Sequence, residues 1–328
     1  MEDKKVKKTL MCFLSRNGHK KLYAFDDTCA WGRKLAKACR RFGIRSSVFN
    51  DPSKVPNLEN AYIFLNMQPG SRDDHFALSA IAEEASLRDK AVMIPKIQEC
   101  RCIFDKRLQA EIFAGWMPKT WIMSNMEEAK AVLSDIKFPF ISKSRASWMS
   151  KNVRLIRDEA EACREIAMAF SDEGIPVHGG RRQKGYLLWQ EFIGGNEYEW
   201  RVILVGNRYA YAIKRFFRED VPFASGSGKI DPVKEINDEI TEIFDFVRRF
   251  SEENRLSVVA ADLLRDTNSR LVVIENHCAW GRENPKHREA LVFEFNGGSW
   301  VSTGRSAEDI FELMARAIHE NCFAGRSV

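Results

Sequence analysis

The chain has 328 residues, of which 45% are hydrophobic and 30% charged, and its formal net charge is +5. These values are ordinary for a folded protein with room for two or three domains, and they exclude a disordered or collagen-like chain. The basic excess is too small for a dedicated nucleic-acid binder and suits an enzyme that holds a phosphorylated ligand. Nucleic acid is therefore not expected as a partner, although that possibility stays open.

The cysteines and the apolar runs indicate the cellular compartment. Eight cysteines are present and none forms a CxxC pair, which favours free thiols in a reducing environment. The first residues, MEDKKVKK, lack the apolar segment of a signal peptide. No run of 18 apolar residues exists, so no membrane span is predicted. We expect a cytoplasmic protein.

The first hundred residues alternate between strand and helix patterns. The expected elements are a strand at Thr9–Ser15, a helix capped by Asp26 and Asp27 and ending near Phe42, strands at Ile44–Phe49 and Ala61–Met67, a helix at Asp73–Arg88 and a strand at Ala91–Ile97. This order predicts a small α/β domain with a mostly parallel sheet. No GxGxxG motif follows any of its strands, so the domain is predicted to be a scaffold and not a dinucleotide site.

The middle of the chain continues with mixed elements. The expected order is a helix at Asp105–Gly115, a strand at Thr120–Met123, a helix at Met126–Ile136, a strand at Phe138–Lys143, a polar loop at Ser144–Asn152, a strand at Val153–Ile156 and a helix at Asp158–Glu173. The segment Gly174–Gly185 is rich in glycine and basic residues, which is typical of a loop and of a boundary between lobes.

The last part of the chain is predicted to begin with antiparallel strands. Tyr186–Ile193, Trp200–Val205 and Tyr209–Arg215 resemble successive antiparallel strands with glycine-containing turns between them. A Gly/Ser loop follows, then a long helix at Pro232–Glu253. Its apolar residues repeat at helical spacing and are expected on the buried face, namely Ile236, Ile240, Ile243, Phe244, Val247 and Phe250. A strand pair at Phe293–Val301 and a helix at Ala307–Asn321 are expected to end the fold.

The hairpin Val258–His277 carries acids where core side chains are expected. If the turn has two or four residues, the numbers of two residues that face each other across the hairpin sum to 535. Asp262 then lies opposite Val273 and diagonal to Glu275. Strand alternation puts Asp262, Val273, Glu275 and His277 on one face. A carboxylate in an apolar strand is costly unless it is paired or binds a metal, so a metal site and a salt-bridged pair of acids are both open.

Other motifs are absent or incomplete. Gly226–Lys229 reads GSGK, but the first glycine of a P-loop would fall at Phe223 and Ile230 stands in place of Ser or Thr. The histidines have no zinc-ligand spacing, and no GxSxG motif is present. We therefore exclude a P-loop, a zinc site and a nucleophile elbow.

The motifs that remain are, in chain order, Asp105-Lys106, the strand FPFISK, the segment LLWQEFIGGNEYEWR, the strand AIKR and the acidic hairpin. Their order resembles the ATP-grasp superfamily, in the style of the glutathione synthetase and RimK-like group. The resemblance implies a small α/β pre-grasp domain at residues 1–98, followed by a two-lobed α+β ATP-grasp fold with lobes at 99–185 and 186–328. It implies a ligase that uses ATP and magnesium to join a carboxylate to an amine.

The resemblance also implies residue roles, which follow the matching motif positions. Lys106 and Lys143 match the phosphate-binding lysines. The adenine and ribose positions are matched by Gln190, Glu191, Ile193, Glu197 and Glu199. The magnesium ligands are matched by Asp262 and Glu275, with His277 or Asn276 as a third. Arg201 and Arg215 match the arginines that stabilise charge on the reacting groups.

Three departures from the family pattern leave alternatives open. The loop SRASWMSKN after Lys143 contains no glycine, with Arg145 or Lys151 available to compensate. His277 takes the strand position of the expected asparagine, and imidazole suits manganese better than magnesium. The expected Arg-x-Asn is missing before PFASGSG. The alternatives are an ATP-grasp kinase of a small hydroxylated substrate and a non-catalytic nucleotide-binding module. A homodimer is also left open.

Overall fold

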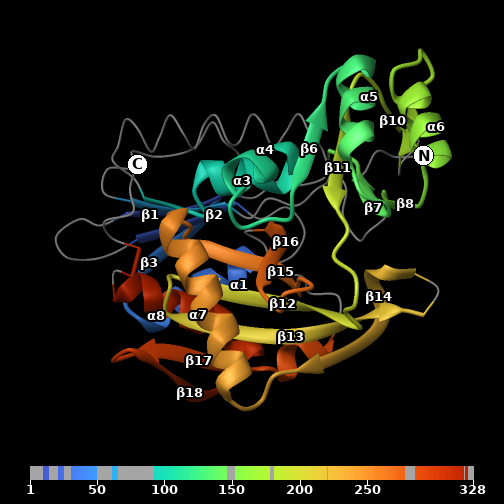
Figure 1. The fold of residues 1–328 in the computed structure, drawn as a ribbon. Coiled ribbons are helices and arrows are strands. Elements are labelled where there is room, and N and C mark those ends of the chain that lie inside the picture. Colours follow the sequence, from blue (N-terminus) through green and yellow to red (C-terminus); the bar gives the residue numbers. More distant parts are fainter. Residues whose placement is uncertain are drawn as a thin grey trace.

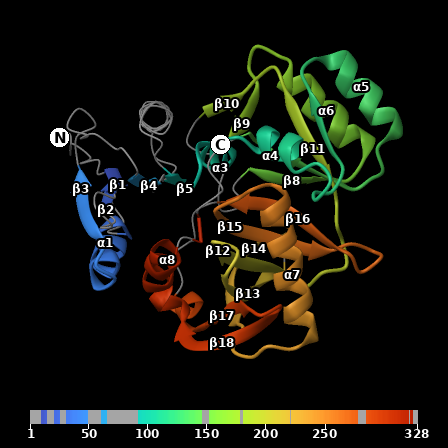
Figure 2. The same cartoon turned by 90° about the vertical axis from the view of Figure 1, so that its left-hand side faces the viewer.

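The computed structural model describes residues 10–14, 21–25, 31–49, 61–65, 92–145, 152–177, 181–219, 221–277, 285–320 and 322–323. Four sheets organise these residues: an N-terminal sheet, a small sheet, a large sheet and a two-stranded hairpin (Figure 1). The small sheet (strands within residues 120–191) and its helices stand above the large sheet (strands within residues 198–306) (Figure 1). The N-terminal sheet (strands within residues 10–94) lies on the far side of the large sheet from helix α7 (Asp238–Glu253) (Figure 2). None of the described helices is long and apolar enough to cross a membrane.

The N-terminal sheet contains both strand directions. Its described elements are β1 (Leu10–Leu14), β2 (Lys21–Phe25), α1 (Trp31–Arg41), β3 (Arg45–Phe49), β4 (Ala61–Leu65) and β5 (Val92–Ile94). β2 is parallel to β3 and β4, and β4 is parallel to β5, as the mostly parallel prediction requires. β1 departs from that prediction, because it is antiparallel to its neighbours. The expected helix at Asp73–Arg88 and the caps Asp26 and Asp27 lie outside the described residues.

The small sheet is fully antiparallel and is covered by two helices. Its order is β6-β11-β7-β8. The elements are β6 (Thr120–Met123), α5 (Met126–Asp135), β7 (Phe140–Lys143), β8 (Val153–Ile156), α6 (Glu159–Ala169) and β11 (Leu187–Glu191). A core of Phe140, Ile166, Trp189 and their neighbours joins helices to strands. The predicted loop at Gly174–Gly185 contains a short hairpin of β9 (Ile175–Val177) and β10 (Arg181–Gln183).

The large sheet has seven described strands, in the order β16-β15-β12-β13-β17-β18 with β14 also paired to β13. The elements are β12 (Tyr198–Val205), β13 (Tyr209–Arg218), β14 (Val221–Pro232), α7 (Asp238–Glu253), β15 (Val258–Arg265), β16 (Leu271–His277), η2 (Pro285–Glu289), β17 (Leu291–Asn296), β18 (Ser299–Ser306), η3 (Ala307–Asp309) and α8 (Ile310–His319). α7 covers one face and α8 lies on the other, beside α1 (Figure 2). Arg41 of α1 pairs with Glu312 of α8 at 2.9 Å, which connects the N-terminal sheet to this body.

Three sequence expectations for this part were wrong. β11 pairs with β6 and β7 and not with β12, so the chain leaves the small sheet after Glu191. The Gly/Ser segment lies within strand β14 and not in a loop. The long helix begins at Asp238, because the Asn237 side chain accepts a hydrogen bond from Ile240 N at 2.9 Å and caps it. Ile236 therefore precedes the helix and is 38% exposed instead of buried.

Two short helices connect the N-terminal sheet to the other two. α3 (Ile97–Phe104) and α4 (Lys106–Ile112) both lie against β16. Phe113, at the end of α4, is buried in the core beneath α7 and stacks edge-on against Phe250 at 5.0 Å between ring centroids. The backbone N–H of Val273 donates to Trp116 O at 2.8 Å. These contacts attach α3 and α4 to the large sheet before the chain enters the small one.

Candidate functional site

The hairpin of β15 and β16 carries a β-bulge that decides where its acids point. The turn spans residues 266–270, one residue more than predicted, and this longer turn alone would send Asp262 and Glu275 to opposite faces. Ile274 is an extra residue between the pairs Leu263–Val273 and Asp262–Glu275, and it reverses the alternation once more. The two acids are therefore directly opposite each other on one face, and the predicted diagonal arrangement was wrong.

The same bulge corrects the position of Val273. The sequence placed this residue on the face of the acids. In the structure Val273 pairs with Leu263, and both are fully buried in the core beneath α7. Val273 and the two acids thus lie on opposite faces of the hairpin, because the bulge shifts the pairing between them.

Asp262 is buried between two arginines. Its Oδ2 lies 2.7 Å from Arg201 Nη2 and 2.7 Å from Arg215 Nη2, and Arg201 Nε also donates to Oδ1. Arg215 pairs in addition with Glu199, the residue opposite it on β12. Burial opposes ionisation of Asp262, but the two guanidinium groups outweigh it and lower the pKa of this carboxyl. Asp262 is therefore held as a carboxylate.

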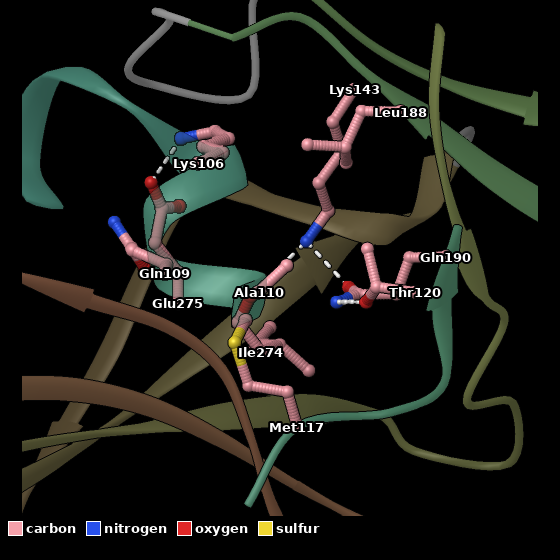
Figure 3. A pocket seen from close by; sticks show the side chains of 10 residues that line it. All are labelled: Lys106, Gln109, Ala110, Met117, Thr120, Lys143, Leu188, Gln190, Ile274 and Glu275. Atoms are coloured by element: carbon pink, nitrogen blue, oxygen red, sulfur yellow. Dashed lines mark hydrogen bonds and ion pairs between the residues drawn. The ribbon is translucent and has the colours of Figure 1, made fainter. Parts of the chain in front are cut away.

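Glu275 meets basic side chains from α4 and from its own strand. Lys106, the first residue of α4, forms an ion pair with Glu275 Oε1 (Figure 3). His277 Nε2 lies 3.1 Å from the same oxygen. Burial opposes ionisation, but Lys106, His277 and Lys143 hold the pKa of Glu275 well below its usual value. The second acid of the hairpin is also ionised.

Lys106 is placed by the start of α4. Asp105 caps this helix by accepting a hydrogen bond from Arg107 N at 3.0 Å. Arg145, two residues beyond β7, donates through Nε to Asp105 Oδ2 at 2.6 Å, and Lys106 N donates to Arg145 O at 3.0 Å. The element that carries Lys106 is thus connected to the strand end that carries Lys143.

Lys143 reaches from the small sheet to the large one. Its Nζ donates to Gln190 Oε1 at 2.7 Å and to the backbone oxygen of Ile274 at 3.1 Å (Figure 3). Gln190 in turn donates to Thr120 Oγ1 at 2.9 Å. Burial between the sheets lowers the pKa of Lys143 to about 8, although Glu275 acts in the opposite direction. This ammonium therefore titrates close to the physiological range.

A narrow cavity lies where these groups meet, between α4, β16 and the small sheet (Figure 3). Its lining combines Lys106, Gln109, Ala110, Met117, Thr120, Lys143, Leu188, Gln190, Ile274 and Glu275. Gln109 was not among the predicted site residues. Its side chain donates to Cys102 O at 2.7 Å and accepts from Asn276 N at 2.9 Å. No motif signals a glutamine within a short helix, so only the packing of α4 on β16 could identify it.

The site is basic overall and contains a matched pair of hard ligands. Lys106, Lys143, Arg201 and Arg215 face Glu199, Asp262 and Glu275, which leaves one net positive charge among these seven groups and suits an anionic ligand. Within the described residues, no three acidic, histidine or cysteine side chains form a metal cluster. Two facing carboxylates nevertheless fit magnesium, which commonly takes one or two carboxylates and completes its shell with phosphate and water.

His277 and Asn276 lie as strand alternation predicts. His277 pairs with Ala260 and contacts Glu275, so it lies on the acidic face. Asn276 pairs with Ala261 on the other face, where its buried Oδ1 has no hydrogen-bond partner among the described residues. Of the two residues considered as a third ligand, His277 is the one on the face of Asp262 and Glu275.

The remaining candidates are spread along the segment that connects the two sheets. Glu191 is exposed at the end of β11, and its backbone N–H donates to Lys119 O at 2.9 Å. Ile193 is half-buried and Glu197 is exposed, so neither belongs to the ion-pair network, whereas Glu199 is buried within it. Lys151 lies outside the described residues.

A scan against protein-family models finds no match, and no curated protein matches the sequence. Solved structures do match the fold. D-cycloserine synthetase DcsG has a TM-score of 0.56 at 16% identity, covering 88% of this chain and 94% of that one. The ATP-grasp ligase PsnB, complexed with a minimal precursor, has a TM-score of 0.52 at 13% identity, covering 87% and 93%.

A third structure extends the likeness. The RimK domain protein ATP-grasp from Sphaerobacter thermophilus has a TM-score of 0.52 at 14% identity, covering 80% of this chain and 93% of that one. At these identities the likeness concerns the fold. Its agreement with the order of motifs along the sequence leads to one conclusion: the chain has the fold of the ATP-grasp superfamily.

Proposed function

We propose that the protein is an ATP-dependent ligase that joins a carboxylate to an amine through an acyl phosphate. The observation that carries the proposal is the bulged hairpin, which sets Asp262 opposite Glu275 beside Lys106 and Lys143. Two facing acids and two lysines from separate elements are what a magnesium–triphosphate group requires. The similar structures support the same class, since DcsG is a D-cycloserine synthetase and PsnB was solved with a minimal precursor, Mg and ADP.

In this proposal the nucleotide lies between the two sheets. Lys106 and Lys143 exchange their present partners for phosphate oxygens. The base lies along the segment from β11 toward β12, with Gln190, Glu191 and Ile193 at the adenine and Glu197 or Glu199 at the ribose. The N-terminal residues 1–98 serve as the pre-grasp domain, and residues 99–185 and 186–328 serve as the two lobes.

Asp262 and Glu275 would hold magnesium, and His277 beside Glu275 makes manganese an alternative. The metal, when bound, would neutralise charge on the phosphates. Arg201 binds Asp262 through two hydrogen bonds and is only 9% exposed, so it orients this carboxylate. Arg215 is less buried and lies between Glu199 and Asp262, where it can stabilise a reacting phosphoryl group.

The reaction has two steps. An oxygen of the substrate carboxylate attacks the γ-phosphorus of ATP and ADP leaves, which forms the acyl phosphate. The amine then attacks the carbonyl carbon, inorganic phosphate leaves, and the amine loses a proton. Arg215 is positioned to stabilise negative charge in both steps.

The test is product analysis with the purified chain, ATP and magnesium. Carboxylates and amines are supplied singly and in pairs, and the products are identified by mass spectrometry. A ligase releases ADP and phosphate only when both co-substrates are present. ADP release with a hydroxylated substrate alone would establish a kinase instead, and nucleotide binding without any turnover would establish a non-catalytic module.

A matched pair of variants connects the activity to the site. Glu275→Gln should abolish turnover because it removes a metal charge, whereas Glu253→Gln, an exposed acid at the end of α7, should leave turnover unchanged. Full activity of Glu275→Gln would refute the assignment of this hairpin as the metal site.

A further inference from the structure

A buried carboxylate lies on the face of the small sheet that packs against α5 and α6, away from the cavity described above. Glu165 of α6 is 5% exposed. Its Oε1 accepts a hydrogen bond from Ser142 Oγ at 2.8 Å, and its Oε2 accepts one from Trp189 Nε1 at 2.8 Å. Arg154 Nη2 forms an ion pair with Oε1. One side chain therefore satisfies partners on β7, β8 and β11.

The three partners form a single row across the sheet. Arg154 of β8 pairs directly with Ser142 of β7, and Ser142 pairs directly with Trp189 of β11. Residues that pair directly lie at the same level of their strands and on the same face. Glu165 thus holds three neighbouring strands at one level.

The surroundings make a carboxylate costly here. Glu165 is flanked along α6 by the core residues Ala162, Ile166 and Ala169, and Trp189 is itself fully buried. An apolar residue of similar volume at such a position is often neutral or stabilising. The carboxylate supplies what an apolar side chain cannot, because its hydrogen bonds fix the direction and the level of each strand.

The cleft side of the same strands carries the proposed nucleotide contacts. Lys143 follows Ser142 and Gln190 follows Trp189, so each points to the opposite face from its neighbour. Lys143 Nζ and Gln190 Oε1 are 2.7 Å apart across the two strands. A shift of one strand relative to the other would separate this pair and move both groups within the cavity they line.

We propose that Glu165 is a positioning residue for nucleotide binding, which acts from behind the sheet by fixing the strands that present Lys143 and Gln190. The proposal rests on the nucleotide site of the proposed function. It assigns to α6 a role in ligand affinity, although no residue of this helix lines the cavity.

The test compares Glu165→Gln with Ile166→Val. The second substitution, at the next residue of the same helix, removes one methylene from the core and leaves Glu165 and its three partners in place. In Glu165→Gln, one acceptor oxygen becomes an N–H donor that faces either Trp189 or Arg154. We expect Mg–ADP affinity, measured by calorimetry, to fall about tenfold, as for a lost hydrogen bond to a charged group. In the ADP-release assay the KM for ATP should rise while kcat at saturating ATP stays close to that of the wild type.

Ile166→Val should lower the melting temperature and leave nucleotide affinity unchanged. If Glu165→Gln does not fold, Ser142→Ala removes one hydrogen bond of the same carboxylate and should weaken affinity in the same direction. Two results would overturn the positioning role of Glu165 and leave the proposed function standing. One is unchanged Mg–ADP affinity in folded Glu165→Gln or Ser142→Ala, and the other is an equal loss of affinity in Ile166→Val. Failure of the wild-type protein to bind Mg–ADP would overturn the proposed function and this inference with it.

Discussion

The two faces of the large sheet are built from alternate residues of the same strands, yet they differ in chemistry where the second face lines the candidate site. Toward α7, β12 and β15 present Trp200, Val202, Val259 and Leu263, which join a continuous apolar core. Toward the cleft, the same two strands present Arg201 and Asp262, which are as deeply buried but carry charge. Burial on the first face stabilises the protein, whereas burial on the second costs desolvation that ion pairing only offsets.

This difference separates the residues that make the fold from those retained for chemistry. An apolar cleft face would serve stability at least as well, because buried ion pairs can often be replaced by well-packed hydrophobic residues without loss. The charges on Arg201, Arg215, Asp262 and Glu275 are therefore best explained by a charged ligand. Substitutions on the two faces should consequently have different consequences for activity even when their effects on stability are similar.

Asp262→Asn should have the largest effect, because it lowers both the stability of the protein and its turnover. It leaves the buried Arg201 and the partly buried Arg215 without the carboxylate they share, with Glu199 and Glu275 as the remaining counter-charges, which should lower the free energy of unfolding by about 3–5 kcal/mol. Turnover should be lost even in the fraction that remains folded. Urea unfolding and ADP release measure the two effects, and Asp231→Asn, an exposed acid on β14, is the matched control. Wild-type turnover of folded Asp262→Asn would contradict the metal assignment.

Phe244→Ala should affect stability alone. Phe244 is 1% exposed in the core beneath α7, with its ring centroid 5.6 Å from that of Phe293 and 5.0 Å from that of Trp300. Its truncation leaves a cavity and should lower the free energy of unfolding by about 3–5 kcal/mol. The turnover of the folded fraction at low temperature should match that of the wild type. A specific loss of turnover, with unfolding accounted for, would show that the two faces are not functionally separate.

More of the apolar face beneath α7 could be predicted from the sequence than of the face that carries the charged site. The helical spacing of Ile240, Ile243, Phe244, Val247 and Phe250 is a local property of the chain, and all five are buried as predicted. The two acids of the hairpin could likewise be singled out, because charges in apolar strands are conspicuous. Their register could not, since it depends on a five-residue turn and on a bulge at Ile274 that no residue type in the sequence signals.

The charged site also draws on elements distant in sequence. Arg145 contacts Asp105, and Lys143 contacts Ile274, across separations of 40 and 131 residues. Gln109 and Glu165 could not be found from the sequence, because each acts through strands that only the fold brings beside it. β11 was misassigned for a related reason, since a strand pattern shows that a strand exists but not which neighbour it will pair with.

The smallest predicted effect concerns pH and depends on Lys143, which connects the charged face to the small sheet. Burial holds its pKa at about 8 in the free protein, and bound phosphates should raise it, so the bound state keeps the proton at higher pH than the free state does. Nucleotide affinity should therefore be constant below about pH 8 and fall by up to tenfold per pH unit above it, until the pKa of the complex is reached. Calorimetric titration with Mg–ADP between pH 7 and 9.5 measures this slope.

Lys143→Ala is the control for that slope, because it removes the titrating group. This variant should bind more weakly at pH 7 and show no decline between pH 8 and 9.5. If Mg–ADP affinity falls in the same way in Lys143→Ala, the group that titrates is another one near the site. A flat profile in the wild type would mean that Lys143 does not exchange Gln190 for phosphate.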